Sequence, residues 1–210
     1  MLGDTNDGDT TDPTLQNAFL RVVNSSIRNT PVEFHGNNPI FGGYLRKATI
    51  EHCDVGKCPH TAIAVGWGWE FSGYSSDNTV AANRVAFANS GCCGGAGAIY
   101  TLGSQNGTAI HANYIVNSSV RDNPQGQGAI HHDQGSRGIV TSNNVIDVAP
   151  EWARVHMATN ISLIDNWSNA HKFSVEEGCT DIHEAGNINV TGKAFPPGAL
   201  RVIEAAGLLP

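Results

Sequence analysis

The stretch Gly97–Val145, GAIYTLGSQNGTAIHANYIVNSSVRDNPQGQGAIHHDQGSRGIVTSNNV, contains two short phrases twice. The phrase Gly-Ala-Ile begins at Gly97 and returns at Gly128, 31 residues later. The phrase IHANYI begins at Ile110 and is echoed by VTSNNV from Val140, 30 residues later. A chain that passes the same places once per turn of a coil produces such spacing. Because repeats of about 20 to 50 residues mark solenoid architectures, this repeat decides the fold.

A six-residue template extends the repeat in both directions. It has an apolar residue, a small polar residue three positions later and a second apolar residue two positions after that. Its small polar positions are Ser25, Cys53, Asn83, Asn113, Asn143 and Asn166, with a partial echo at Asn187. A second series of apolar strand residues is Ile63, Ile99, Ile130 and Val155. The two apolar residues of the template are five apart, which breaks the two-residue period of a strand, so we expect a bend between them.

The predicted fold is all-β: a right-handed parallel β-helix of about six to seven turns with a short C-terminal helix. One turn cannot bury its apolar face alone, so successive turns must stack into a continuous core. An Asn at each bend tolerates a left-handed conformation, and its amide can bond the equivalent Asn one turn away. We therefore expect an Asn ladder of Asn83, Asn113, Asn143 and Asn166. A helical solenoid is the competing architecture, but the apolar spacing does not follow a helical period.

The chain divides into three segments. Residues 1–14 are almost free of apolar side chains and are expected to form a flexible N-terminal tail. Residues 15–192 carry the β-helix. Residues 193–210 begin near a Pro-Pro-Gly sequence and carry apolar residues at helical spacing before Gly207, which predicts a short helix packed on the flank of the coil or over its last turn.

Composition excludes several classes of function. The net charge is −7 and Lys and Arg never cluster, so no nucleic-acid partner is expected. No apolar run is long enough to span a membrane, and no secretory signal opens the chain as written. Localisation stays open, and would be extracellular or periplasmic if a signal was removed. The five cysteines fit no zinc pattern; Cys53 and Cys58 are expected to be buried thiols, with a disulfide between them as the alternative in an exported protein.

Three phrases resemble a known family. They are GWGW at Gly66–Trp69, GAIYTLGSQ at Gly97–Gln105 and GAIHHDQGS at Gly128–Ser136. They resemble successive turns of pectate-lyase-like right-handed parallel β-helix proteins, and are most similar to β-helix glycoside hydrolases and their uncharacterised relatives. The ending Phe195–Leu208 is similar to the end of the catalytic domain in that group, and the resemblance covers roughly residues 50–210. In those relatives the third phrase carries an aromatic residue and an acidic pair, and here Asp133 is followed by Gln134.

If Ile63, Ile99, Ile130 and Val155 point inward, the residues that follow them would align into one stripe of side chains along the coil. Asp133 is the predicted catalytic nucleophile or general acid/base, with His131 beside it, and Glu177 is the predicted second carboxylate that a glycosidase needs. Glu176 and Glu151 are alternatives to Glu177. A hydrogen-bonding turn carboxylate is the alternative role of Asp133. The predicted substrate-binding residues, aromatic platforms and imidazoles, are Trp67, Trp69, Tyr100, His132 and His156.

Several alternatives remain at this site. His131 and His132 point to opposite faces if both lie on the strand, so at most one joins a given site. We expect no metal and no cofactor; a metal site of His131, Asp133 and His156 is the alternative. The aromatic loop from Trp67 to Tyr74 would serve either a ligand or a neighbouring chain.

Two functions follow from the resemblance and the stripe. The first is a carbohydrate-active β-helix protein that acts on a polysaccharide or oligosaccharide, glycoside hydrolase-like, with a polysaccharide lyase less favoured because no acidic cluster would build its calcium site. The second is a non-catalytic module for glycan binding or homo-oligomeric assembly. Carbohydrate is the expected partner, with a possible homo-oligomer, guessed to be a trimer. A protein that stays monomeric in light scattering at high concentration would contradict that oligomer.

Overall fold

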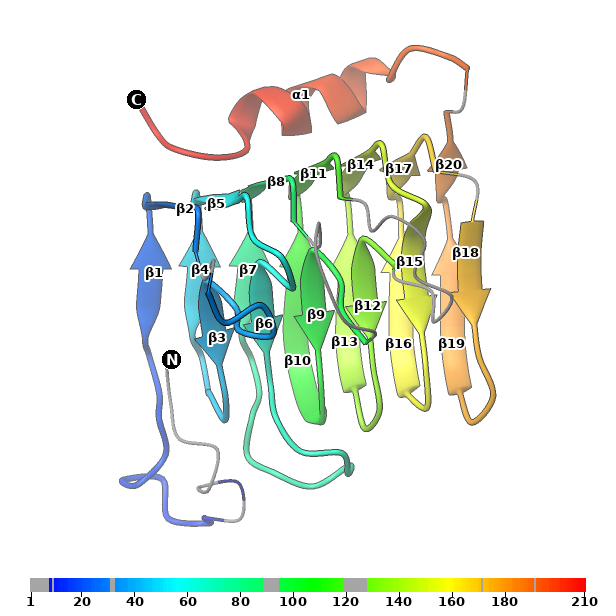
Figure 1. Cartoon of the computed structure of the whole chain (residues 1–210). Coiled ribbons are helices and arrows are strands. Elements are labelled where there is room, and N and C mark those ends of the chain that lie inside the picture. Colours follow the sequence, from blue (N-terminus) through cyan, green and yellow to red (C-terminus); the bar gives the residue numbers. More distant parts are fainter. Residues whose placement is uncertain are drawn as a thin grey trace.

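The computed structural model describes residue 8 and residues 10–30, 33–88, 95–118, 128–170, 172–190 and 192–210. Within them the chain forms a parallel β-helix of about seven turns, built from three parallel sheets (Figure 1). The predicted all-β fold with one short C-terminal helix is confirmed. In the described part Cys53 and Cys179 are free thiols, so no Cys53–Cys58 disulfide forms; Cys92 and Cys93 lie outside the described residues.

Each sheet collects one strand from each turn. The first sheet has the order β1 (Arg21–Val23), β4 (Thr49–Glu51), β7 (Thr79–Ala81), β10 (Ser104–His111), β13 (Arg137–Ser142), β16 (Thr159–Ile164) and β19 (Thr180–Ala185). The second has the order β2 (Ser26–Arg28), β5 (Asp54–Gly56), β8 (Arg84–Ala86), β11 (Tyr114–Val116), β14 (Val145–Asp147), β17 (Trp167–Ser168) and β20 (Ile188–Asn189). The third has the order β3 (Ile40–Gly42), β6 (Ile63–Val65), β9 (Ile99–Thr101), β12 (Ile130–His132), β15 (Glu151–Val155) and β18 (Lys172–Val175).

Stacked β-branched side chains fill the interior. Ile63, Ile99 and Ile130 pair in register across β6, β9 and β12, and all three are fully buried. The register differs from the prediction at the next turn, where Ala153 and not Val155 pairs with Ile130. Val155 instead pairs with His132. The predicted register is wrong by two residues. Val155 therefore still faces inward, but the residues around it pair with different partners than predicted.

The Asn ladder is present, with one member wrongly predicted. Ile110 pairs with Thr141 and not with Val140, whose side chain is 42% exposed. The ladder residue of that turn is therefore Asn144, and the prediction of Asn143 was wrong. This turn contains one more residue than the turn before it, and a slip of one residue sends every side chain to the other face.

Side-chain amides join the turns one after another. The Nδ2 group of each ladder Asn donates to Oδ1 of the next, at 3.0 Å from Asn83 to Asn113, 2.9 Å from Asn113 to Asn144 and 3.0 Å from Asn144 to Asn166. Asn166 donates in turn to Asn187. The left-handed bend falls on the residue before each ladder Asn, such as Ala112 with φ 54° and Asn143 with φ 54°. The Asn amide thus satisfies backbone groups at the bend and does not itself take the strained conformation.

Helix α1 (Pro197–Ala205) covers the flank of the coil. It runs beside the second sheet and back toward the first turn (Figure 1), where the backbone of Leu209 donates to Asn24 Oδ1. Gly207, with φ 99°, is the C′ residue expected from the sequence. Within the described residues no helix is long and apolar enough to cross a membrane.

Candidate active site

Two rows of side chains run along the outside of the third sheet. Strand pairing places Phe41, Ala64, Tyr100, His131 and Arg154 at equivalent positions of five successive strands. A second row follows directly after the strand ends: Asp133 after β12, His156 after β15 and Glu176 after β18. Successive strands are about 4.8 Å apart, so the second row presents a carboxylate, an imidazole and a carboxylate on three consecutive turns.

Asp133 is the centre of the hydrogen-bond network. Its Oδ2 accepts a hydrogen bond from the Tyr100 hydroxyl at 2.5 Å. Its Oδ1 accepts from the backbone N–H of Gln134 at 2.8 Å and lies 2.7 Å from Nδ1 of His156. The carboxylate is thus held by groups from three turns, and it keeps only a small exposed area because its side chain is 15% accessible.

The two histidines of the site differ in their surroundings. His131 is buried; its Nδ1 lies 3.3 Å from the carbonyl of Ala96 and its ring meets Tyr100 edge to face, with centroids 5.3 Å apart. Within the part of the chain that the structure describes, His131 Nε2 has no hydrogen-bond partner; it lies 3.9 Å from Asp133 Oδ1. His156 is half-buried, and its Nε2 lies 3.9 Å from Oε2 of Glu176. An imidazole between two carboxylates is suited to carry a proton between them.

A shallow hollow lies between these groups. It is lined by Gly95, His131, Asp133, Arg154, His156 and Glu176. The Arg154 guanidinium forms an ion pair with Glu176 across one turn. The hollow therefore combines two carboxylates, two imidazoles and one guanidinium, which is a polar set suited to recognise hydroxyl groups or to move protons.

Burial and hydrogen bonding set the protonation of the site. Burial raises the pKa of Asp133, but His131 and the hydrogen bonds from Tyr100, His156 and the Gln134 backbone outweigh it, so the pKa lies below its usual value. Burial, together with the Asp133 charge, raises the pKa of the Tyr100 hydroxyl. Burial lowers the pKa of His131. At neutral pH the site thus holds an ionised Asp133, a protonated Tyr100 that donates to it and a neutral His131.

The structure brings together some of the predicted residues. Tyr100, His131, Asp133 and His156 lie in one network. Glu177 is exposed and outside the hollow, whereas its neighbour Glu176 lines it.

His132 points into the core. Its Nδ1 lies 2.9 Å from Thr101 Oγ1 and its Nε2 lies 2.9 Å from Thr141 Oγ1. A substrate in the hollow cannot reach this ring, so we do not keep it among the proposed binding residues.

Arg154 was missed from the sequence. Aligning Val155 with Ile130 made His156 equivalent to His131, whereas the observed pairing makes Arg154 its equivalent. Because of the same two-residue shift, the sequence alignment did not place Asp133, His156 and Glu176 at equivalent positions of successive turns. The sequence signal was present, because each of the three residues directly follows a three-residue phrase that begins with an apolar residue: Ile130–His132, Ala153–Val155 and Phe173–Val175.

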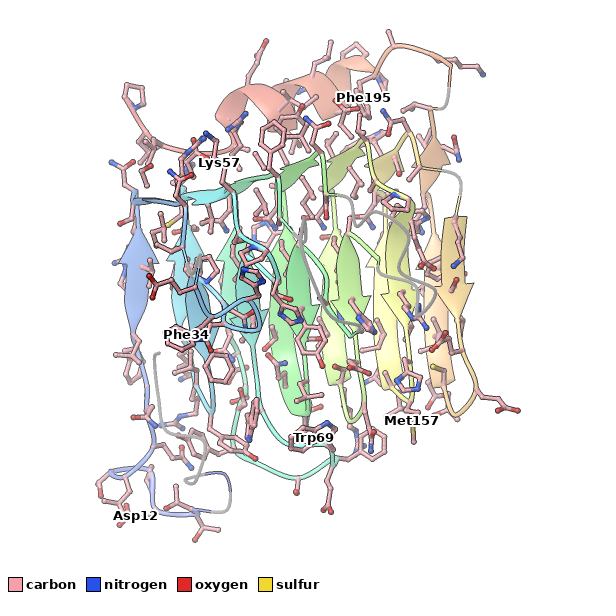
Figure 2. The ribbon with its side chains drawn as sticks, in the orientation of Figure 1. Asp12, Phe34, Lys57, Trp69, Met157 and Phe195 are labelled. Carbon is pink, nitrogen blue, oxygen red and sulfur yellow. The ribbon has the colours of Figure 1, made fainter. Side chains whose placement is uncertain are left out.

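The predicted aromatic platforms lie on the same face of the molecule as the hollow. Trp67 and Trp69 belong to the loop between β6 and β7, and Trp69 sits at the edge of the molecule where the strands of the third sheet end (Figure 2). Among the described residues, no group of three or more His, Cys, Asp or Glu side chains could hold a metal ion.

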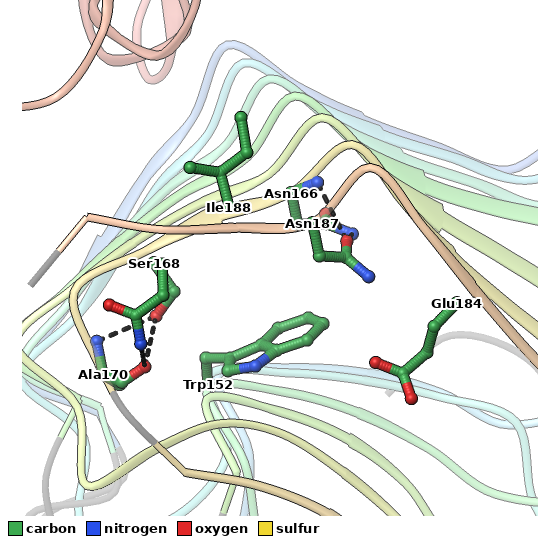
Figure 3. Close-up of a pocket in the computed structure, with 8 residues that line it drawn as sticks. Trp152, Asn166, Ser168, Ala170, Glu184, Asn187 and Ile188 are labelled. Atoms are coloured by element: carbon green, nitrogen blue, oxygen red, sulfur yellow. Dashed lines mark hydrogen bonds between the residues drawn. The ribbon is translucent and has the colours of Figure 1, made fainter.

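A second hollow lies at the C-terminal end of the coil. Figure 3 shows Trp152 and Glu184 there, with Asn166, Asn187 and Ile188 on the far side. Glu184 occupies the position that Leu163 holds in the previous turn, and burial raises the pKa of its carboxyl. This hollow is the open end of the core, and a charged side chain at that end opposes the addition of a further strand.

Comparison with known proteins supports the fold. No family model matches the sequence, and no curated protein matches it. A solved structure described as "Glycoside hydrolase" is similar, with a TM-score of 0.67 and 22% sequence identity. The match covers 96% of this chain and 29% of that chain, so this chain spans less than a third of that protein's length. The fold and the similarity define a β-helix protein of the architecture found in that hydrolase.

Proposed function

We propose that this chain is a carbohydrate-active β-helix protein of the glycoside hydrolase type, in which Asp133 and Glu176 act on the sugar. The observation that carries the proposal is the row Asp133–His156–Glu176, on three consecutive turns around one hollow. The similarity in fold to a glycoside hydrolase supports the same class.

The separation of the two carboxylates suits hydrolysis. His156 lies 2.7 Å from Asp133 through one ring nitrogen and 3.9 Å from Glu176 through the other. These contacts and the width of an imidazole ring set an upper limit of about 9 Å on the distance between the two contacting oxygens, which is compatible with the separations of about 5 to 9.5 Å found between the paired carboxylates of glycosidases.

Each residue then has a role. Asp133, held ionised, is the carboxylate that stabilises positive charge or activates water. Glu176 is the second carboxylate, in place of the predicted Glu177. His156, in contact with both, carries the proton, and Asp133 fixes which ring nitrogen faces the hollow. His131 lines the hollow beside Asp133, and its Nε2 is buried and has no hydrogen-bond partner among the described residues.

Glycan binding without turnover is the second candidate. One observation favours it: both oxygens of Asp133 already accept hydrogen bonds within the protein, as a structural carboxylate would.

Three variants separate the two functions. Asp133→Asn and Glu176→Gln remove one charge each, and Glu177→Gln is the matched control because it removes the adjacent, exposed charge. We expect the first two to lower turnover of an aryl glycoside or polysaccharide by on the order of hundredfold or more, with the control unchanged. Turnover is screened over a panel of both substrate types, and binding is measured in parallel. Binding without turnover in the wild type would establish the second candidate, and turnover that survives in Asp133→Asn would contradict the first.

A further inference from the structure

Three aromatic side chains form a cluster on the same face as the hollow. The rings of Phe41 and Trp67 meet at 73° with centroids 5.5 Å apart, and those of Trp67 and Trp69 meet at 67° with centroids 5.1 Å apart. We call these three residues the aromatic cluster. Its outer member, Trp69, is 54% exposed, so the cluster is not a closed part of the core.

Another hollow, distinct from the one beside Asp133 and from the one at the C-terminal end of the coil, borders the aromatic cluster. Its lining is Gly36, Asn37, Asn38, Phe41 and Trp67. His60 Nδ1 lies 3.1 Å from Asn38 Oδ1, which fixes that amide group. Aromatic faces beside amide groups match a sugar ring, whose C–H face packs on an aromatic ring while its hydroxyls take hydrogen bonds.

The loop that carries Trp67 and Trp69 is packed tightly against the turns beside Asp133. Gln134, next to Asp133, donates to the carbonyl of Trp69 at 3.2 Å. Glycines permit the contact: a Cβ at Gly103 would lie 2.4 Å from the carbonyl oxygen of Trp67, and a Cβ at Gly135 would lie 2.6 Å from that of Glu70. The aromatic cluster is therefore fixed in position relative to the carboxylate.

The strand register gives the distance between the hollow that borders the aromatic cluster and the hollow beside Asp133. Phe41, Ala64, Tyr100 and His131 occupy one row, so three strand spacings separate Phe41 from His131. This is about 14 Å, on the order of two to three linked pyranose units. One monosaccharide cannot reach both hollows, whereas a chain laid parallel to the coil axis can.

We propose that the aromatic cluster is a remote binding subsite, and that the substrate is a linear polysaccharide lying along the third sheet from Phe41 to Glu176. This inference rests on the proposed function for the class of ligand, and adds its length, its direction and the residues that hold its far end.

The test is the dependence of binding on chain length. Cello-, xylo- and chito-oligosaccharides of two to six residues are titrated against the wild type, Trp67→Ala and Trp69→Ala by calorimetry. Phe87→Ala is the control, because it removes an exposed aromatic ring that follows β8 in the second sheet. Thermal unfolding of each variant checks that the coil is retained.

We expect the affinity of the wild type to rise on the order of tenfold or more between two and five residues in the series that binds. Trp67→Ala should abolish that rise and weaken binding of the longer oligosaccharides most, with Trp69→Ala intermediate and Phe87→Ala like the wild type. Affinity independent of length, an equal loss at all lengths in Trp67→Ala, or no binding by any series would overturn the inference. A wild-type oligomer that dissociates on Trp69→Ala substitution would overturn it as well, by assigning the cluster to contact between copies.

The inference and the proposed function fail in different ways. Length-dependent binding that requires Trp67, without turnover of any substrate, would refute the hydrolase and keep the subsite. Turnover that requires Asp133 but is independent of chain length and of Trp67 would do the reverse.

Discussion

Asn144→Ala should lower the free energy of unfolding by on the order of 3 to 5 kcal/mol. The Asn144 amide accepts hydrogen bonds from the backbone N–H and the side-chain Nδ2 of Asn113, and donates to the carbonyl of Ile110. Alanine removes this partner from the buried N–H of Asn113 and from the buried carbonyl of Ile110, and it leaves unpaired one of the two Nδ2 hydrogens of Asn113, since the group also donates to the Val80 carbonyl. An orphaned buried polar group costs about 1 to 3 kcal/mol, so the three together make a large part of the stability of a domain of this size.

Asn143→Ala is the matched control. Asn143 is the preceding residue, exposed, with its backbone in the left-handed region at φ 54°. Alanine tolerates the left-handed conformation less well than asparagine does, so this variant should lose only about 1 kcal/mol of the free energy of unfolding. Urea denaturation of both variants measures the difference. Equal losses would contradict the register in which Asn144, and not its neighbour, belongs to the ladder.

Stability should fall by about 2 kcal/mol between pH 7 and pH 5 because of His132. Burial lowers the pKa of His132 to about 3 in the folded chain, against 6.5 in the unfolded one. Between these values the unfolded state binds a proton that the folded state does not, so stability is complete above pH 6.5 and is lost as the pH falls. His131, whose pKa is also lowered by burial, acts in the same direction.

The variant His132→Gln separates the contribution of His132 to the pH dependence of stability from that of the other titratable groups. Glutamine can bond Thr101 and Thr141 but cannot take up a proton, so the variant should show a shallower slope of unfolding free energy against pH, whatever its stability at pH 7. Urea denaturation at half-unit steps from pH 7.5 to pH 5 gives both slopes. Above pH 5 the ionised Asp133 adds little, because the lowered pKa of its carboxyl affects stability only near and below pH 4. Parallel slopes in the two proteins would show that the interior does not keep His132 neutral.

The expected results for Asn144 and His132 both depend on the strand register, which the sequence predicted least well. The repeat of Gly97-Ala98-Ile99 at Gly128 predicted the correct pairing of Ile99 with Ile130, because both copies have the same length and the same bends. The echo of Ile110 at Val140 was off by one, because the turn gained a residue and Thr141, a polar residue, occupies the inward position beside His132.

The sequence by itself determined the coil. Apolar residues five apart around a small polar residue, repeated about every 30 positions, can be buried only by stacking turns, and that requirement fixes the parallel β-helix, the Asn ladder and the general position of Asp133. Tertiary structure decided the site. Whether Glu176 or Glu177 faces the hollow, whether His132 joins it and whether Arg154 lies beside His131 all depend on one- or two-residue shifts between strands. Such shifts leave the apolar pattern nearly unchanged, but they move every polar side chain to a new neighbour because alternate residues of a strand face opposite sides.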